Sequence, residues 1–158
     1  MSEPKTPQPP ADLTKLQILD FDVMQEGWST YDLEDGNRMR CRIVLLQMRA
    51  PDIQPKKGDP IAPQISQHVI VDVPPNRRGS PGHPATQEEV AKPKEHGGEE
   101  VAIRSSSEPW NEYHITNTNV RLRVKIIVNR IWKIRDRFDQ NGDPVYVVTS
   151  TVIPVFES

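Results

Sequence analysis

Two segments of the chain, 38–46 and 121–129, share one pattern, in which basic and apolar residues alternate and then give way to a run of apolar residues. They read RMRCRIVLL and RLRVKIIVN. Because successive side chains on a strand point to opposite faces, this alternation predicts strands with one basic and one apolar face. No apolar stripe at helical spacing is long enough to predict a helix. The pattern therefore favours an all-β fold.

Each alternating segment belongs to a predicted hairpin. In 27–48 the turn is Glu34-Asp35-Gly36-Asn37, where Gly36 tolerates a positive φ. In 119–157 the Asn141-Gly142 pair separates a long strand ending near Phe138 from a return strand over 145–152. Weaker strands are predicted at 16–23, 68–73, 101–104 and 112–118. About six or seven short strands suit a small antiparallel barrel or sandwich.

Two stretches lack the apolar residues needed to offset their ordering entropy. Residues 1–15 contain four prolines and predict a disordered N-terminal arm. Residues 76–100 combine Gly, Pro and charge with only Ala and Val as apolar residues, and predict a long disordered insertion between strands. The remainder of 16–158 reads as a single β domain. A low mean hydropathy of −0.64 and 16 prolines agree with this division.

The charges are unevenly placed along the chain. The 20 Lys and Arg against 22 Asp and Glu give a net charge of −2, which supplies no overall attraction for nucleic acid or an anionic membrane. Residues 1–37 hold two lysines and eight carboxylates, whereas 38–50 hold four arginines and no acid, and 119–137 hold seven basic residues. Either the acids pair with the basic rows across strands, or the basic rows stay free for an anionic partner.

The sequence offers no constellation of catalytic residues. The four histidines have no metal-ligand spacing, and Cys41, the single cysteine, falls on a predicted core face, where burial raises the pKa of a thiol. No phosphate-binding loop or nucleophile elbow occurs. We therefore expect no enzymatic activity, no cofactor and no metal site. With no secretory signal and no apolar run of membrane-spanning length, we expect a cytoplasmic protein.

The outward faces of the two long strands are the candidate site. Their basic halves are Arg38, Arg40 and Arg42 on the first strand and Arg121, Arg123 and Lys125 on the second. Beyond these residues the alternation fails, and the outward rows continue as Val44, Leu46 and Met48 and as Ile127, Asn129 and Ile131. Three explanations fit these apolar halves: a barrel that closes on itself through bulges or a covering loop, a protein partner, or a ligand pocket.

We interpret the surface as a protein–protein docking site of a non-enzymatic, structural or accessory subunit, either in a homo-oligomer or in a larger complex. The partner-binding residues would be Arg38, Arg40, Arg42, Val44, Leu46, Arg121, Arg123, Lys125, Ile127, Ile131 and Trp132. The alternative is a nucleic-acid-binding small β-barrel that uses the arginine-rich strand faces. Sparse aromatic residues weigh against that alternative, because single-stranded nucleic acid usually stacks on them.

Overall fold

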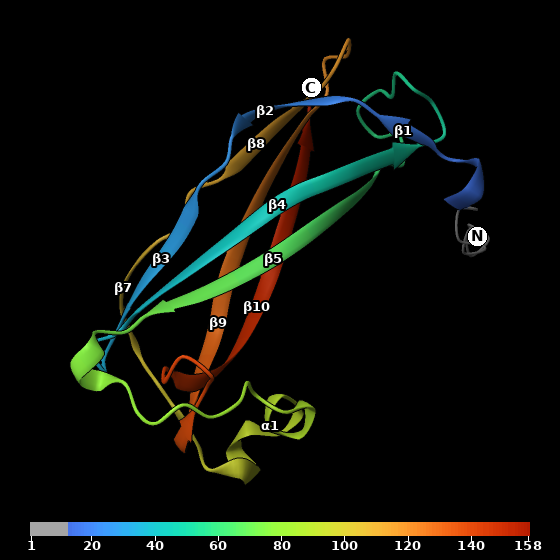
Figure 1. The fold of residues 1–158 in the computed structure, drawn as a ribbon. Coiled ribbons are helices and arrows are strands. Elements are labelled where there is room, and N and C mark those ends of the chain that lie inside the picture. The colour runs from blue at the N-terminus through green and yellow to red at the C-terminus, as the bar shows by residue number, and fades with distance from the viewer. Residues whose placement is uncertain (1–12) are drawn as a thin grey trace, which may run out of the picture.

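The computed structural model describes residues 13–158, and these form two antiparallel β-sheets that share one core (Figure 1). The first sheet contains β1 (Gln17–Leu19), β3 (Trp28–Leu33), β4 (Arg38–Ala50), β5 (Ala62–Asp72) and β7 (Ile103–Ser107). The second contains β2 (Phe21–Gln25), β6 (Gly98–Glu100), β8 (Asn111–Ile115), β9 (Arg121–Phe138) and β10 (Pro144–Glu157). The helical elements are η1 (Leu13–Lys15), η2 (Pro75–Arg77), α1 (Gln87–Ala91) and η3 (Pro93–His96).

Each sheet is built around one long central strand. In the first sheet, β5 pairs along one edge of β4, while β3 and β1 pair along the other edge and β7 lies outside β3. In the second sheet, β10 pairs along one edge of β9, while β8 and β6 pair along the other edge and β2 lies outside β8. The all-β prediction is therefore confirmed, but the structure has ten strands in two sheets and no closed barrel.

Both predicted hairpins are present, because their turns have the expected chemistry. Gly36 has a φ of 88° between β3 and β4, and its N–H donates to the carbonyl of Leu33 at 3.0 Å. Gly142 has a φ of 79° between β9 and β10, and its N–H donates to the carbonyl of Asp139 at 3.0 Å. These two hairpins supply the longest strands of the fold.

A β-bulge in each central strand explains why the alternation in the sequence is not regained after Val44 and Ile127, which themselves stay half-buried on the outward face. On β4, Leu45 pairs with Ile65 but Gln47 pairs with Gln64, which leaves Leu46 as an extra residue. On β9, Val128 pairs with Ser150 but Arg130 pairs with Thr149, which leaves Asn129 extra. An extra residue reverses which side chains face inward. Consequently Met48 and Ile131, predicted to point outward, lie in the core instead.

The core lies between the two sheets and is drawn from both. Its largest fully buried side chains are Tyr31, Tyr113, Leu33, Met39, Met48, Ile115, Leu122 and Ile131, while Ile134 belongs to a smaller cluster with Val145 and Val147. Cys41 is also fully buried there, on the inward face of β4. Burial raises the pKa of its thiol to about 11, so Cys41 packs as a small apolar residue.

The connection between β5 and β7 contains ordered elements, contrary to the prediction that 76–100 is disordered. Helix α1 begins with a capping box, in which the Glu89 N–H donates to Thr86 Oγ1 at 3.2 Å and the Thr86 N–H donates to Glu89 Oε1 at 2.9 Å. Glu89 in turn accepts two hydrogen bonds of 2.9 Å from Arg137 on β9. Local capping, this ion pair and the pairing of β6 with β9 hold the segment against the second sheet.

The predicted N-terminal arm, residues 1–15, lies mostly outside the described residues. The described structure begins at Leu13 with η1, and in place of the single strand predicted at 16–23 there are two short strands, β1 and β2, of which β2 extends to Gln25. The predicted strand at 68–73 begins earlier than expected, because β5 already starts at Ala62 and is considerably longer than the sequence indicated.

Candidate interaction surface

The basic row on β4 is paired with acids of the same chain. Arg40 Nε lies 2.8 Å from an oxygen of Asp72, across the β4–β5 pair. The Arg38 guanidinium is 3.1 Å from Asp32 on β3, and that of Arg42 is 2.6 Å from Glu26. Of the two interpretations left open by the sequence, internal pairing is the one found for these three arginines.

The basic row on β9 follows the same arrangement in part. Arg123 lies 3.3 Å from Glu112 on β8 and 3.5 Å from Glu157 on β10, so it bridges three neighbouring strands. Lys125 is half-buried, and Arg121 is exposed at the start of the strand. Of the six residues in the two predicted basic rows, Arg38 and Arg121 are exposed and the other four are half-buried.

A tryptophan lies beneath each basic row. The guanidinium carbons of Arg40 and Arg42 lie 4.9 and 5.6 Å from the ring centroid of Trp28. Arg123 and Lys125 lie 4.8 and 5.5 Å from the ring of Trp110. These cation–π contacts, together with the ion pairs, occupy much of the hydrogen-bonding and stacking capacity that nucleic acid would need.

The predicted apolar contact residues are only partly at the surface. Leu46, the extra residue of the β4 bulge, is 55% exposed, whereas Val44, Ile127 and Trp132 are half-buried. Ile131 is only 1% exposed. Its place in the predicted partner surface is therefore corrected: the bulge at Asn129 turns its side chain into the core.

The long outer strands, β5 and β10, each have a free edge. Within the described residues β5 pairs only with β4, and β10 pairs only with β9. Charged residues occur only at their last positions, Asp72 in β5 and Glu157 in β10, and the stretches 64–71 and 145–153 contain no proline. Edge strands normally carry charges, prolines or covering loops that prevent pairing with other chains. In these two strands the prolines, Pro63, Pro144 and Pro154, lie toward the strand ends, so the middle of each edge carries neither charge nor proline.

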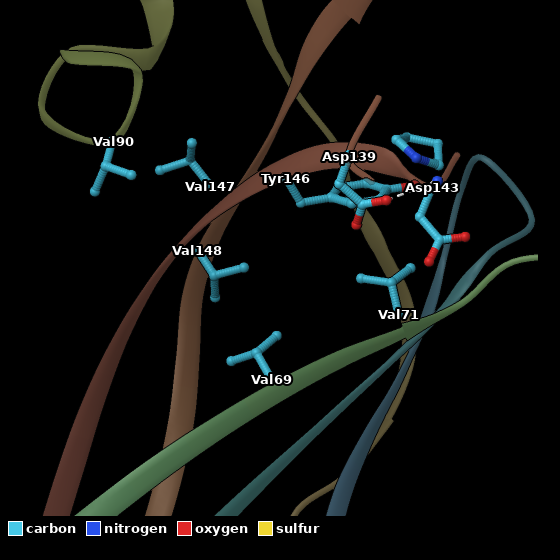
Figure 2. Close-up of a pocket in the computed structure, with 9 residues that line it drawn as sticks. Val69, Val71, Val90, Asp139, Asp143, Tyr146, Val147 and Val148 are labelled. Atoms are coloured by element: carbon cyan, nitrogen blue, oxygen red, sulfur yellow. Dashed lines mark hydrogen bonds between the residues drawn. The ribbon is translucent and has the colours of Figure 1, made fainter. Parts of the chain in front are cut away.

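A groove lies between the two outer strands, and it is lined partly by valines and partly by Asp139, Asp143 and Tyr146 (Figure 2). It has a volume of about 370 Å³, and its sides are formed by Val69 and Val71 of β5, by Val147 and Val148 of β10, and by Val90 of α1. Val69 is 46% exposed, and the adjacent Ile70 is 42% exposed. Because neighbouring residues of a strand face opposite ways, β5 presents apolar side chains on both faces.

Further along the same strands, the two sheets are joined by a side-chain hydrogen bond. Ser150 Oγ of β10 donates to Gln67 Oε1 of β5 at 3.2 Å. The two free edges therefore run close together along one side of the molecule. Charged edge residues in this stretch are absent within β5 and β10, so strand pairing here would require no desolvation of ionised groups.

A polar cluster closes one end of the groove. Tyr146 donates to Asp35 Oδ2 at 2.5 Å and accepts from Asn37 Nδ2 at 2.8 Å, while Lys133 Nζ lies 3.2 Å from the same Asp35 oxygen. Burial raises the pKa of Asp35, but the hydrogen bonds from Tyr146, the Asn37 backbone and Lys133 outweigh it and hold the pKa low. Burial and Asp35 together raise the pKa of Tyr146. Asp35 is therefore kept ionised and Tyr146 protonated, and their hydrogen bond anchors the turn between β3 and β4.

Sequence reasoning missed the β5 edge and the groove. A readable signal existed, because 64–71 is an uncharged stretch that ends in HVIV, typical of a strand with both faces apolar. The prolines of the preceding segment hid the first half of the strand. That β5 and β10 lie close to each other could not be predicted from the sequence, because it depends on how the two sheets pack.

No protein family, curated protein sequence or solved structure matches the chain. Within residues 13–158, no helix has the length and apolar character required to cross a membrane.

Proposed function

We propose that this protein is a non-enzymatic interaction protein, a structural or accessory subunit, that docks through its two pairs of long strands, β4–β5 and β9–β10. The contact is made by adding a strand of another protein chain to the free edges of β5 and β10. Backbone hydrogen bonds supply the affinity in such pairing, and the side chains beside the edge supply the specificity. The partner is a second copy in a homo-oligomer or another subunit of a larger complex.

The observation that carries the proposal is the composition of the edges. Two outer strands of 11 and 14 residues have charged residues only at their last positions. Exposed apolar residues at Val69 and Ile70 extend the edge into a contact surface. Leu46 and the half-buried Val44, Ile127 and Trp132 lie on the central strands beside these edges.

The alternative, nucleic-acid binding by the arginine faces, has less support. Arg38, Arg40 and Arg42 are each within 3.1 Å of a carboxylate oxygen of this chain. A phosphate would have to displace those carboxylates, and bases would have to displace the arginines from the tryptophan ring. Binding by an apolar edge requires neither displacement.

Light scattering after size-exclusion chromatography tests the proposal, at about 50 mM and about 200 mM salt. We expect a mass above that of one 18.0 kDa chain that does not fall with added salt. Lysines at both edges, in the variant Val69→Lys/Ser150→Lys, should reduce this mass because a charged edge disfavours strand addition. The matched control is Ile53→Lys, which alters a similarly exposed apolar residue outside the strands.

Two results would contradict the proposal. One is an edge variant that associates as strongly as the unaltered chain. The other is a chain that stays at 18.0 kDa under all conditions and binds a short oligonucleotide with an affinity that falls steeply as salt rises. The second result would support the nucleic-acid alternative.

A further inference from the structure

The ten strands fall into two sets of five that pair in the same way. We call β1–β5 the first unit and β6–β10 the second unit. Within the first unit, β4 pairs with β1, β3 and β5; within the second, β9 pairs with β6, β8 and β10. Between the units, β2 pairs with β8, and β7 pairs with β3. Each strand therefore has a counterpart five strands later, and all the pairings are reproduced.

A sequence repeat accompanies the repeated pairing. Residues 26–33 read EGWSTYDL, and residues 108–115 read EPWNEYHI. Glu, Trp and Tyr recur at identical spacing, and each segment ends in an aliphatic residue that is buried in the core. The alternating segments 38–46 and 121–129 follow these repeats and form the corresponding strands β4 and β9. The likeness of the two halves thus extends well beyond the basic rows.

The repeated glutamate and tyrosine join the two units to each other. Tyr31 of the first unit donates to Glu108 Oε2 of the second at 2.8 Å. Tyr113 of the second donates to Glu26 Oε2 of the first at 2.7 Å. Each glutamate lies where the chain passes from one sheet to the other, between β2 and β3 or between β7 and β8. The two hydrogen bonds therefore fix both crossings reciprocally.

Several finer details also occur twice at matching positions. Trp28 lies beneath Arg40 and Arg42, and Trp110 lies beneath Arg123 and Lys125. One arginine above each ring also forms an ion pair with the last residue of the outer strand. These pairs are Arg40 with Asp72 of β5 and Arg123 with Glu157 of β10. The bulges at Leu46 and Asn129 occur at the same distance from the start of each repeated strand pattern. Independent strands would have no reason to agree in all of these.

We infer that the chain consists of two copies of one structural unit, assembled as a strand-exchanged pair. The interaction surface of each unit is the open edge of its inner short strand, β3 or β8. The partner that fits this edge is the second strand of another copy of the unit, which is β7 for the edge of β3 and β2 for the edge of β8. Neither unit completes its own sheet, because the strand that would lie there belongs to the other unit.

Exchanging the repeated segments within the full chain tests the inference. In one variant 26–33 and 108–115 trade places. We expect cooperative thermal unfolding with a midpoint within about 5 °C of the unaltered chain, since few buried contacts change. In the control, 26–33 trades places with 110–117, which preserves the alternation of faces but shifts Trp and Tyr by two residues at both places and removes the glutamate from position 26. We expect the control to lose cooperative unfolding.

Two symmetrised chains extend this test. One carries the 26–33 sequence at both places, and the other carries the 108–115 sequence at both places. We expect both to unfold cooperatively. Failure of the exchanged chain and of both symmetrised chains overturns the equivalence of the two units. An equally stable two-residue control overturns it as well, because any alternating strand would then serve.

Cleavage of the folded chain tests the exchange itself. A specific protease site inserted between Lys94 and Glu95, which are exposed in the connection between the units, allows one cut after folding. We expect the two fragments to elute together in native buffer and to separate in denaturant, with reassociation that depends on concentration. Fragments that separate in native buffer show that each unit is complete alone, and they overturn the exchange.

Discussion

The Tyr113→Phe substitution removes one buried hydroxyl group from a crossing between the sheets. Tyr113 is 1% exposed, donates to Glu26 at 2.7 Å and accepts from Asn111 Nδ2 at 3.3 Å. A hydrogen bond to a charged group contributes about 1.5–3 kcal/mol to stability. The neighbours keep other partners, since Glu26 retains Arg42 at 2.6 Å and Asn111 retains the Ile43 carbonyl at 3.0 Å. We therefore expect a loss of about 1.5–2 kcal/mol, near the lower end of that range.

Urea unfolding of both proteins measures this loss. The urea dependence of the free energy should be unchanged, and the melting temperature should fall by about 4–6 °C for a chain of this size. Tyr31→Phe is the matched variant, since Tyr31 donates to Glu108 at 2.8 Å and also accepts from the Val128 N–H at 3.3 Å. It should cost at least as much. A loss below about 0.5 kcal/mol at Tyr113 would refute the stabilising role of the crossing.

The same hydroxyl gives a pH dependence with a defined sign. Burial, aided by Glu26, raises the pKa of Tyr113 from 10.0 to about 12. A folded-state pKa above the unfolded value means that this stabilisation is complete below pH 10 and is lost as the pH rises through 12. Unfolding measured across that range should show a shallower decline for Tyr113→Phe. An identical decline in both proteins would show that Tyr113 does not contribute.

Three further predictions concern stability. Hydrogen bonds from Arg137 lower the pKa of Glu89 from 4.5 to about 2, so its contribution is present above pH 4.5 and lost as the pH falls through 2. For Glu89→Gln, the free energy of unfolding should vary less with pH across this window than for the unaltered chain, and at pH 7 it should be lower by about 1–2 kcal/mol, allowing for screening. The same pH dependence in both proteins would contradict this prediction. Deleting Leu46 should rotate Met48 out of the core and cost at least about 3 kcal/mol in urea unfolding, whereas Leu46→Ala should change stability by less than about 0.5 kcal/mol; equal effects would exclude the bulge. Gly142→Ala requires a positive φ of 79° and brings Cβ to 2.6 Å from a backbone oxygen, so thermal unfolding should show a loss of about 1–2 kcal/mol, and an unchanged midpoint would count against this strain.

The sequence was sufficient to predict the fold class and both long hairpins. Alternation of basic and apolar residues requires strands with two different faces, and the glycines at 36 and 142 permit the turns. These are local properties, so they could be read from neighbouring residues. The number of strands was underestimated because short strands such as β1 and β6 are defined by pairing with distant residues.

The bulges were the main obstacle to predicting the candidate site. One extra residue in a strand produces an apolar run in the sequence, and such a run is expected both for an exposed interface and for a bulge that reverses the two faces. The two bulge residues, Leu46 and Asn129, have no common chemical property by which a bulge could be recognised in the sequence. The ion pair of Arg40 depends on Asp72, which lies at the end of the neighbouring strand β5. Such partners become evident only when the register is known. The Glu-Trp-Tyr repeat, in contrast, was readable from the sequence.

The repeated architecture also determines how often the same edge is displayed. Since β5 and β10 hold corresponding places in the strand pairing, the proposed docking gives one polypeptide two near-equivalent attachment points. Because each chain contributes two such edges, any closed ring of these chains would contain an even number of them, whatever the number of chains. A binding protein with its own twofold axis could engage both points of one molecule at once.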